Sequence, residues 1–164
     1  MVTVLVVQSH PSEKSFNEAI LTRVISHLDT ARTDTTLIRL GKEKTILDTN
    51  IKKPDSIIFI YPTWWGGYPA SFLEWVNLVL TTQNDLFVNV KSILSITTHG
   101  SSKLVNLVQG EWGRAYTKRK IATVCHTDVK LKWVSLYKID RRADSELEEF
   151  LQAIGTELDR AIKN

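Results

Sequence analysis

The chain has a single cysteine, few prolines and few glycines, and these shortages exclude several classes of protein. Its 164 residues contain one Cys, four Pro and seven Gly. The one thiol, Cys125, cannot form an internal disulfide and is expected to be buried and inert, and no Cys/His cluster has zinc spacing. Collagen-like, disordered and disulfide-stapled chains are therefore excluded. No metal site is expected, and a reducing, cytoplasmic compartment is indicated.

Strong charge of one sign and long hydrophobic runs are also missing. The 21 basic and 18 acidic residues leave a net charge of +3. The densest basic stretch, residues 118–120 with Arg114 nearby, is too short for a nucleic-acid-binding arm and is typical of a solvated helix face. No apolar run has the length of a signal peptide or a membrane span. We therefore expect no nucleic-acid partner and no integral membrane segment.

Apolar runs rich in β-branched residues predict five strands. No repeat or Gly/Ser-rich linker divides the chain, so residues 1–164 are expected to form one domain with a sizeable core. Short continuous apolar runs are typical of strands buried on both faces, and the lysines in the last run suit a sheet edge. The expected strands are residues 2–7, 35–40, 56–61, 92–97 and 129–137.

Two capping-box patterns predict the starts of two helices. Ser15 with Glu18, and Ser145 with Glu148, have the S-x-x-E spacing in which the serine and glutamate side chains satisfy free N–H groups of the first turn. Apolar residues recur at spacings of three and four after each pattern, as on the buried face of a helix. Helices are therefore expected after both serines.

Other segments complete the expected elements. Pro69 suits the first position of a helix. Residues 113–126 are expected to be helical, whereas 41–54 leaves room for at most a short helix. His27 and His126 lie within helical patterns, so we expect structural roles for both.

The alternation of strands and helices predicts an α/β fold. Buried parallel strands with intervening helices form a sheet covered on both faces. Five strands in this length fit a doubly wound, flavodoxin-like domain, in which ligands bind beyond the carboxyl ends of the strands. The loops at that edge are residues 8–15, 62–68 and 97–102, and packing alone does not explain their composition.

The first loop combines hydroxyls, a histidine and a helix N-terminus. It has neither G-x-G-x-x-G nor the Walker pattern, so no dinucleotide or nucleotide-triphosphatase fingerprint is present. A helix N-terminus attracts phosphate through its free N–H groups and its dipole. Ser9, His10, Ser12 and Ser15 can complete such a site. The alternative is that Ser15 only caps the helix and His10 is an ordinary loop residue.

The second loop carries two adjacent tryptophans, Trp64 and Trp65, directly after a buried strand. Side chains alternate along extended chain, so both cannot enter one core, and at least one is expected at the surface or in a cleft. A planar indole beside backbone amides suits a planar heterocycle through stacking and edge hydrogen bonds. The alternative, for one of the two, is packing under the following helix.

The third loop, residues 97–102, again follows a strand. Its amides and hydroxyls can hydrogen-bond ligand carbonyls and ring nitrogens. The alternative is an ordinary turn capped by Ser101 or Ser102. No Ser-His-Asp or Cys-His arrangement follows from the spacing of these residues.

Each loop contains a motif of one known family. The motifs are Ser9-His10-Pro11 followed by Ser15-Phe16-Asn17, then Pro62-x-x-Trp65-x-Gly67-x-Pro69-Ala70 with Trp75 further on, and Ser95-x-Thr97-Thr98-x-Gly100. In this order they resemble the flavin-phosphate loop, the flavin-ring loop and the third flavin loop of the flavodoxin-fold NAD(P)H:quinone oxidoreductase family. That family includes soluble quinone reductases and ancillary subunits of bacterial glutathione-gated potassium efflux systems. The resemblance covers nearly the whole chain.

The resemblance implies a non-covalently bound flavin, FMN or alternatively FAD, reduced by NADH or NADPH. In the family, a ping-pong cycle passes hydride to the flavin, and a quinone or similar electrophile then takes two electrons in the same pocket. The short chain favours FMN because it leaves little material for an adenine site. The matching residues are His10, Ser15, Phe16 and Asn17 at the phosphate end, Pro62, Thr63, Trp64, Trp65 and Gly66 along the ring, and Thr97, Thr98, His99 and Gly100 at its polar edge.

The sequence departs from the family at three positions. His99 replaces the first glycine of the usual Thr-Thr-Gly-Gly. Some members carry a tyrosine and a histidine that stabilise charge on the reduced flavin, and Val105 and Trp112 stand at those places. The reduced flavin would then rely on backbone amides or on His99, for which we hypothesise a catalytic role.

Three functions are consistent with these observations. The leading interpretation is an NAD(P)H oxidoreductase that acts on a small quinone-like acceptor and, by resemblance, forms a homodimer. The alternative is a regulatory or ancillary subunit with weak or no turnover, which the missing tyrosine and histidine favour. A flavodoxin-type electron carrier is disfavoured, because such carriers are usually acidic and this chain has a pI near 9.0.

Overall fold

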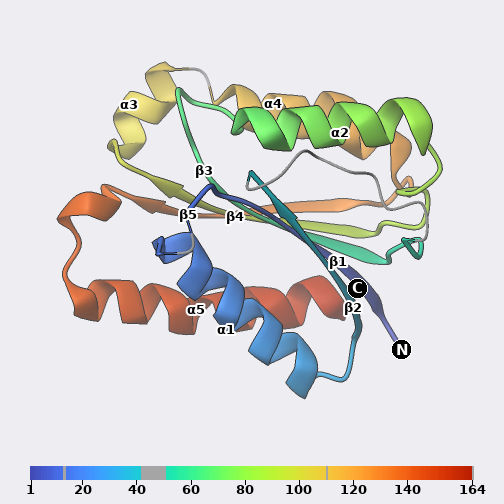
Figure 1. Ribbon diagram of the computed structural model, residues 1–164, viewed down its shortest axis with the longest axis horizontal. Coiled ribbons are helices and arrows are strands. Elements are labelled where there is room, and N and C mark those ends of the chain that lie inside the picture. Colours follow the sequence, from blue (N-terminus) through green and yellow to red (C-terminus); the bar gives the residue numbers. More distant parts are fainter. Residues whose placement is uncertain (13, 42–50, 110, 164) are drawn as a thin grey trace.

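A five-stranded parallel sheet forms the centre of the molecule (Figure 1). The computed structural model describes residues 1–12, 14–41, 51–109 and 111–163. The strand order is β2-β1-β3-β4-β5, and every neighbouring pair is parallel, which confirms the predicted doubly wound sheet. The strands are β1 (Thr3–Ser9), β2 (Asp34–Leu40), β3 (Ser56–Pro62), β4 (Ser92–His99) and β5 (Lys130–Tyr137).

Helices cover both faces of this sheet. Helices α1 (Phe16–Thr30) and α5 (Asp144–Ile162) lie on one face, whereas α2 (Ala70–Thr82) and α4 (Trp112–Tyr116) lie on the other (Figure 1). Each face has its own cluster of buried apolar side chains. The shorter helical segments are α3 (Lys103–Val108), the π-helix η1 (Thr117–Ile121), and the 3₁₀-helices η2 (Ala122–Val124) and η3 (Ile139–Arg141).

The burial of each strand follows its place in the sheet. Every residue of β3 and β4 is buried, because helices cover both of their faces. Strand β5 is at an edge, and its Lys130 and Lys132 are exposed there, as the sequence predicts. Within the part of the chain that the structure describes, no helix has the length and apolar composition to cross a membrane.

Both predicted capping boxes are wrong, although both helices exist. Helix α1 has Ser15 at its N-cap, but no side-chain capping bond forms there. Helix α5 begins at Asp144, and Glu146 accepts a hydrogen bond from the N–H of Ala143 at 3.0 Å. The glutamates of the two predicted boxes bind arginines on other elements instead, Glu18 binding Arg39 and Glu148 binding Arg23.

The helix predicted over residues 113–126 is present as one continuous helical stretch from Trp112 to Val124, whose geometry changes from α4 through the π-helix η1 to the 3₁₀-helix η2. The hydroxyl of Thr117 donates to the carbonyl of Gly113 at 3.0 Å, one turn back. Such back-bonding competes with the regular ladder and accompanies bends, and a π-turn begins at this threonine. The short helix allowed within 41–54 falls largely on residues 42–50, which lie outside the described residues.

Candidate functional site

A cleft of about 430 Å³ opens at the carboxyl ends of β1, β3 and β4. Parallel strands present their following loops at this edge, so three segments distant in sequence meet here. Nine of the residues predicted from sequence line the cleft, together with Ile139 and Asp140 of η3, which the sequence analysis missed. The nine are His10, Ser15, Phe16, Asn17, Pro62, Thr63, Trp64, Thr98 and Gly100.

The N-terminus of α1 forms one wall of the cleft and has unsatisfied polar atoms. The Oγ atom of Ser15 and the Oδ1 atom of Asn17 are buried without a hydrogen-bond partner in the described ranges. The amide of Asn17 donates to the hydroxyl of Thr98 at 3.0 Å, which joins α1 to the end of β4. Buried polar groups are rarely left unpaired in a folded protein, so a polar group entering the cleft at this helix end would have partners there.

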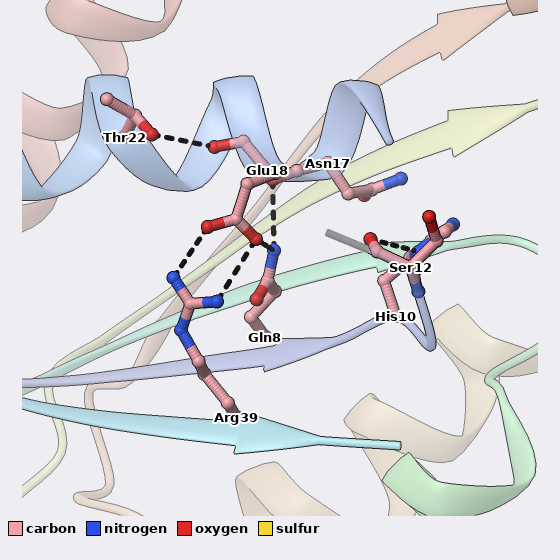
Figure 2. Close-up of polar contacts among 7 residues, drawn as sticks. All are labelled: Gln8, His10, Ser12, Asn17, Glu18, Thr22 and Arg39. Atoms are coloured by element: carbon pink, nitrogen blue, oxygen red, sulfur yellow. Dashed lines mark hydrogen bonds and ion pairs between the residues drawn. The ribbon is translucent and has the colours of Figure 1, made fainter. Parts of the chain in front are cut away.

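Glu18 is held away from this helix end (Figure 2). Its carboxylate accepts hydrogen bonds from Arg39 at 2.5 Å and from the amide of Gln8 at 3.1 Å. This pairing explains why the predicted capping box does not form. It also neutralises the only acidic side chain in the first turn of α1, so the N–H groups there can attract an anion.

His10 contributes a ring nitrogen to the same wall. Its Nδ1 atom accepts a hydrogen bond from the N–H of Ser12 at 3.0 Å (Figure 2). The same Nδ1 atom lies 3.0 Å from the carbonyl oxygen of Ser12, to which it donates in the other neutral tautomer, so the tautomer sets whether Nε2 donates or accepts. His10 lines the cleft with its ring centroid 6.5 Å from that of Trp64.

The two tryptophans lie in a tight hairpin. Trp64 and Gly67 exchange backbone hydrogen bonds of 3.1 and 2.9 Å. Trp65 and Gly66 between them have φ of 51° and 77°, as in a type I′ turn. Trp64 is 46% exposed and Trp65 88%, so the expected surface position is confirmed for both and neither packs under α2. The large indole of Trp65 is therefore attached to a left-handed backbone conformation that bulky residues rarely adopt.

The side chains at the carboxyl end of β4 point alternately to the two faces of the sheet. Thr98 faces the cleft and Asn17, whereas Thr97 and His99 line a second, smaller hollow of about 20 Å³. Gly66 lines this hollow too, and Thr63 lines both spaces. The structure therefore divides the predicted ring-contacting residues between two adjoining spaces. Trp65 lines neither of them.

His99 is buried in a hydrogen-bonded network. The carboxamide of Asn106 donates to Ser101 and Ser102, which turns its oxygen toward the Nδ1 of His99 at 2.8 Å. Nδ1 is therefore the donor, and Nε2 lies 2.8 Å from the hydroxyl of Thr97. Burial lowers the pKa of His99, and the neighbouring Arg114 charge lowers it further. The ring is neutral at neutral pH.

The structure also gives the surroundings of three further residues that the sequence analysis discussed, Ser102, His27 and Cys125. Ser102 caps α3, accepting from the N–H of Val105 at 3.4 Å. His27 bonds Asp159 across α1 and α5 at 2.9 Å. Cys125 is partly buried, and burial raises the pKa of its thiol to about 12, so it is unreactive at neutral pH.

Arg114, Trp133 and Ser135 also line the second hollow and were not among the site residues predicted from the sequence. Ser135 lies near the carboxyl end of β5, and its place in an expected strand could have drawn attention to it. Arg114 gave no such signal, because it was assigned to a solvated helix face. Val105 and Trp112, at the places of the family's tyrosine and histidine, are 44% and 37% exposed.

Comparisons with known proteins agree with this architecture. The family described as flavodoxin-like fold matches residues 2–158 of the chain. Among curated proteins, no sequence matches significantly.

Several solved structures are similar over nearly their full length. Smu.1420 from Streptococcus mutans is 22% identical, with a TM-score of 0.77, and the match covers 95% of this chain and 98% of that one. An NAD(P)H:quinone oxidoreductase from Methanothermobacter marburgensis is 18% identical, with a TM-score of 0.72 and coverages of 96% and 95%. An FMN-dependent NADH-azoreductase from Bacillus anthracis, in complex with FMN, is 11% identical, with a TM-score of 0.76 and coverages of 99% and 100%. Together with the family match, these likenesses lead to one assignment: the chain belongs to the flavodoxin-like fold family.

Proposed function

We propose that this protein is a flavin-dependent NAD(P)H oxidoreductase. In this proposal NADH or NADPH supplies two electrons, FMN (alternatively FAD) carries them, and a quinone or similar electrophile receives them. The order is ping-pong, because donor and acceptor would use one cleft in turn. The family assignment and the names of distant structural neighbours support an oxidoreductase.

The observation that carries the proposal is the pair of buried, unsatisfied polar atoms at the N-terminus of α1. A helix N-terminus binds phosphate and other anions through its free N–H groups and its dipole. The carboxamide of Asn17 and the hydroxyl of Thr98 can exchange donor and acceptor roles, which would turn an N–H of Asn17 toward the ligand. With the aromatic wall of Trp64, the cleft fits a phosphorylated planar heterocycle.

Within this proposal the residues predicted from sequence bind and orient the cofactor, although Trp65 lines neither space. His10, Ser15, Phe16 and Asn17 would hold its phosphate end. Pro62, Thr63, Trp64, Trp65 and Gly66 would lie along its ring, and Thr97, Thr98, His99 and Gly100 at its polar edge. A bound flavin supplies the capacity to accept a hydride and release two electrons. His99, neutral and held by Asn106, would position Thr97 and remains our hypothesis for a catalytic residue.

The visible spectrum tests the proposal. Purified protein is mixed with excess FMN or FAD and desalted. We expect a retained band near about 450 nm that NADH or NADPH bleaches without oxygen, because hydride transfer removes the oxidised-flavin absorption. Loss of all flavin on desalting would contradict the proposal. A retained band that neither nucleotide bleaches would contradict the oxidoreductase and support the ancillary subunit.

The ancillary subunit remains the second candidate function. Val105 and Trp112 cannot stabilise charge as the tyrosine and histidine of the family would, and both lie at an exposed apolar surface. Turnover separates the two candidates. Negligible NAD(P)H consumption with every quinone tried, despite bound flavin, would favour a subunit that acts through another protein.

We also propose that the protein is a cytoplasmic, single-domain homodimer of residues 1–164. The support is an exposed apolar face beside the cleft. Backbone contact between Gly66 and Gly113 joins the tryptophan hairpin to α4, and Gln109, which directly follows α3, lies against Gly66. The face consists of Trp64, Trp65, Leu104, Val105, Leu107, Val108 and Trp112. Apolar patches of this kind mark protein interfaces more often than ordinary surface.

An aspartate in this apolar face is expected to prevent dimer formation. The substitution Val108→Asp would bury a carboxylate in the proposed interface, so the mass in solution should fall to that of the monomer. Val88, 47% exposed and outside the apolar face, offers the control Val88→Asp, which should stay dimeric. Light scattering after gel filtration measures both. Equal masses for the two variants would contradict the interface.

A further inference from the structure

Several hydrogen-bond donors line the second hollow, beside the carboxylate of Glu111. It lies between the ends of β3, β4 and β5 and the segment around α4. The guanidinium of Arg114 and the hydroxyls of Thr63 and Ser135 line it. So does Trp133, whose indole N–H is buried and makes no hydrogen bond within the described ranges. Such a lining suits the oxygen of a carbonyl or an anion.

Arg114 is the one basic side chain with a permanent charge among the described residues that line this hollow. Its carbon Cζ lies 5.5 Å from the ring centroid of Trp133, a cation–π distance. A guanidinium nitrogen lies 3.3 Å from the carboxylate of Glu111. Both charged side chains are partly buried, at 41% and 23% side-chain exposure, so solvent screens their fields only in part. The indole and the carboxylate hold the cation at the hollow.

The hollow adjoins the residues predicted to contact the flavin ring. Thr63 lines both the cleft and the hollow, and Gly66, Thr97 and His99 line the hollow. A ligand that touches all of these residues must therefore present an edge to the hollow. That edge would meet Arg114.

We propose that Arg114 stabilises the negative charge that the flavin ring gains on reduction, with Glu111 setting the strength of its field. This inference rests on the proposed function and concerns the same cleft. A hydride carries two electrons and one proton, so its transfer adds one negative charge to the bound ring. A nearby fixed cation favours the reduced form over the neutral oxidised form. Arg114 would thus supply the charge that the absent tyrosine and histidine cannot.

The midpoint potential of protein-bound FMN tests this proposal without measuring turnover. We expect Arg114→Gln to weaken binding of reduced FMN about tenfold relative to oxidised FMN. For a two-electron couple this lowers the potential by about 30 mV. Glu111→Gln removes the opposing carboxylate. Reduced FMN should then bind about threefold more tightly relative to oxidised FMN, which raises the potential. Affinity for oxidised FMN should change less than about threefold in both variants, because that ring is neutral.

Three controls separate charge from structure. Arg114→Lys keeps the charge and should restore most of the potential. Arg119→Gln removes an exposed cation of η1 and should leave the potential unchanged. The double variant of Arg114→Gln and Glu111→Gln should lie nearer the wild type than Arg114→Gln alone.

The possible failures are distinguishable. If the wild type binds FMN but Arg114→Gln leaves its potential unchanged, the inference is overturned and the proposed function stands. Shifts of the same sign for Arg114→Gln and Glu111→Gln would show a structural disturbance and also overturn it. If the wild type binds no flavin, both the proposed function and the inference fail.

Discussion

Replacing Ser15 by Asp is expected to weaken FMN binding about 100-fold while leaving the protein folded. Ser15 is at the N-cap of α1 and is among the residues that line the cleft. A carboxylate there would face the phosphate of the cofactor. Two unit charges about 4 Å apart repel by about 4 kcal/mol at an effective dielectric constant of about 20. Partial exposure reduces this, and a 100-fold loss is about 2.7 kcal/mol.

The fold should tolerate this substitution because Asp is as good an N-cap as Ser. The free energy of unfolding should therefore change by less than about 1 kcal/mol. Fluorescence titration with FMN measures the binding, and urea denaturation measures the stability.

Two controls identify the phosphate as the group that is repelled. Riboflavin lacks the phosphate, so its affinity should change less than about threefold. Ser145→Asp adds the same charge at the start of α5, and we expect FMN affinity to stay at the wild-type value. An equal loss of riboflavin and FMN affinity in Ser15→Asp would contradict a phosphate site at α1.

Replacing Trp75 by Ala is expected to lower the free energy of unfolding by about 3–5 kcal/mol. Trp75 has no exposed surface and packs from α2 against Phe72 and Phe87, with ring centroids 6.4 and 6.2 Å away. Its loss leaves a cavity between α2 and the sheet that the neighbouring rings cannot fill. Because domains are stable by only about 5–15 kcal/mol, this loss is a large share of the total.

Trp65→Ala provides the matched control for this change. Trp65 is 88% exposed, so its truncation should change the stability of the protomer by less than about 0.5 kcal/mol. Urea denaturation at a protein concentration where both variants are monomeric allows the comparison. Equal destabilisation by the two substitutions would show that Trp65 packs in solution, contrary to the structure.

The strand segments were predictable because a strand that is buried on both faces has a continuous apolar run in the sequence. The continuous apolar run 56–61 allows little other than a central strand, and β3 is fully buried. The meeting of the three loops followed from parallel topology, which brings all carboxyl ends to one edge. Nine predicted residues consequently line one cleft. Their contact with a cofactor stays a prediction.

The capping boxes failed because local spacing ignores distant partners. Ser15 and Glu18 have the right spacing, but Arg39 on β2 offers Glu18 a charged partner at 2.5 Å. Likewise, Glu148 meets Arg23 of α1. Arginine carries a full positive charge and several N–H donors, whereas the N-cap offers a carboxylate a single neutral N–H, so the tertiary partner prevails.

The sequence by itself determined which segments are strands and which loops share an edge, whereas the exposure of both tryptophans comes from the hairpin turn that holds them. The strand segments and their shared edge depend on local periodicity and on the chirality of parallel crossovers. The tertiary structure alone decided that Thr98 faces the cleft while His99 faces a separate hollow with Arg114. The alternation of side chains along β4 places Thr98 and His99 on opposite faces of the sheet. Only the packing of helices on those two faces determines which residues each of them contacts. For the same reason, no local pattern could reveal that Arg114, far along the chain, lies beside these loops.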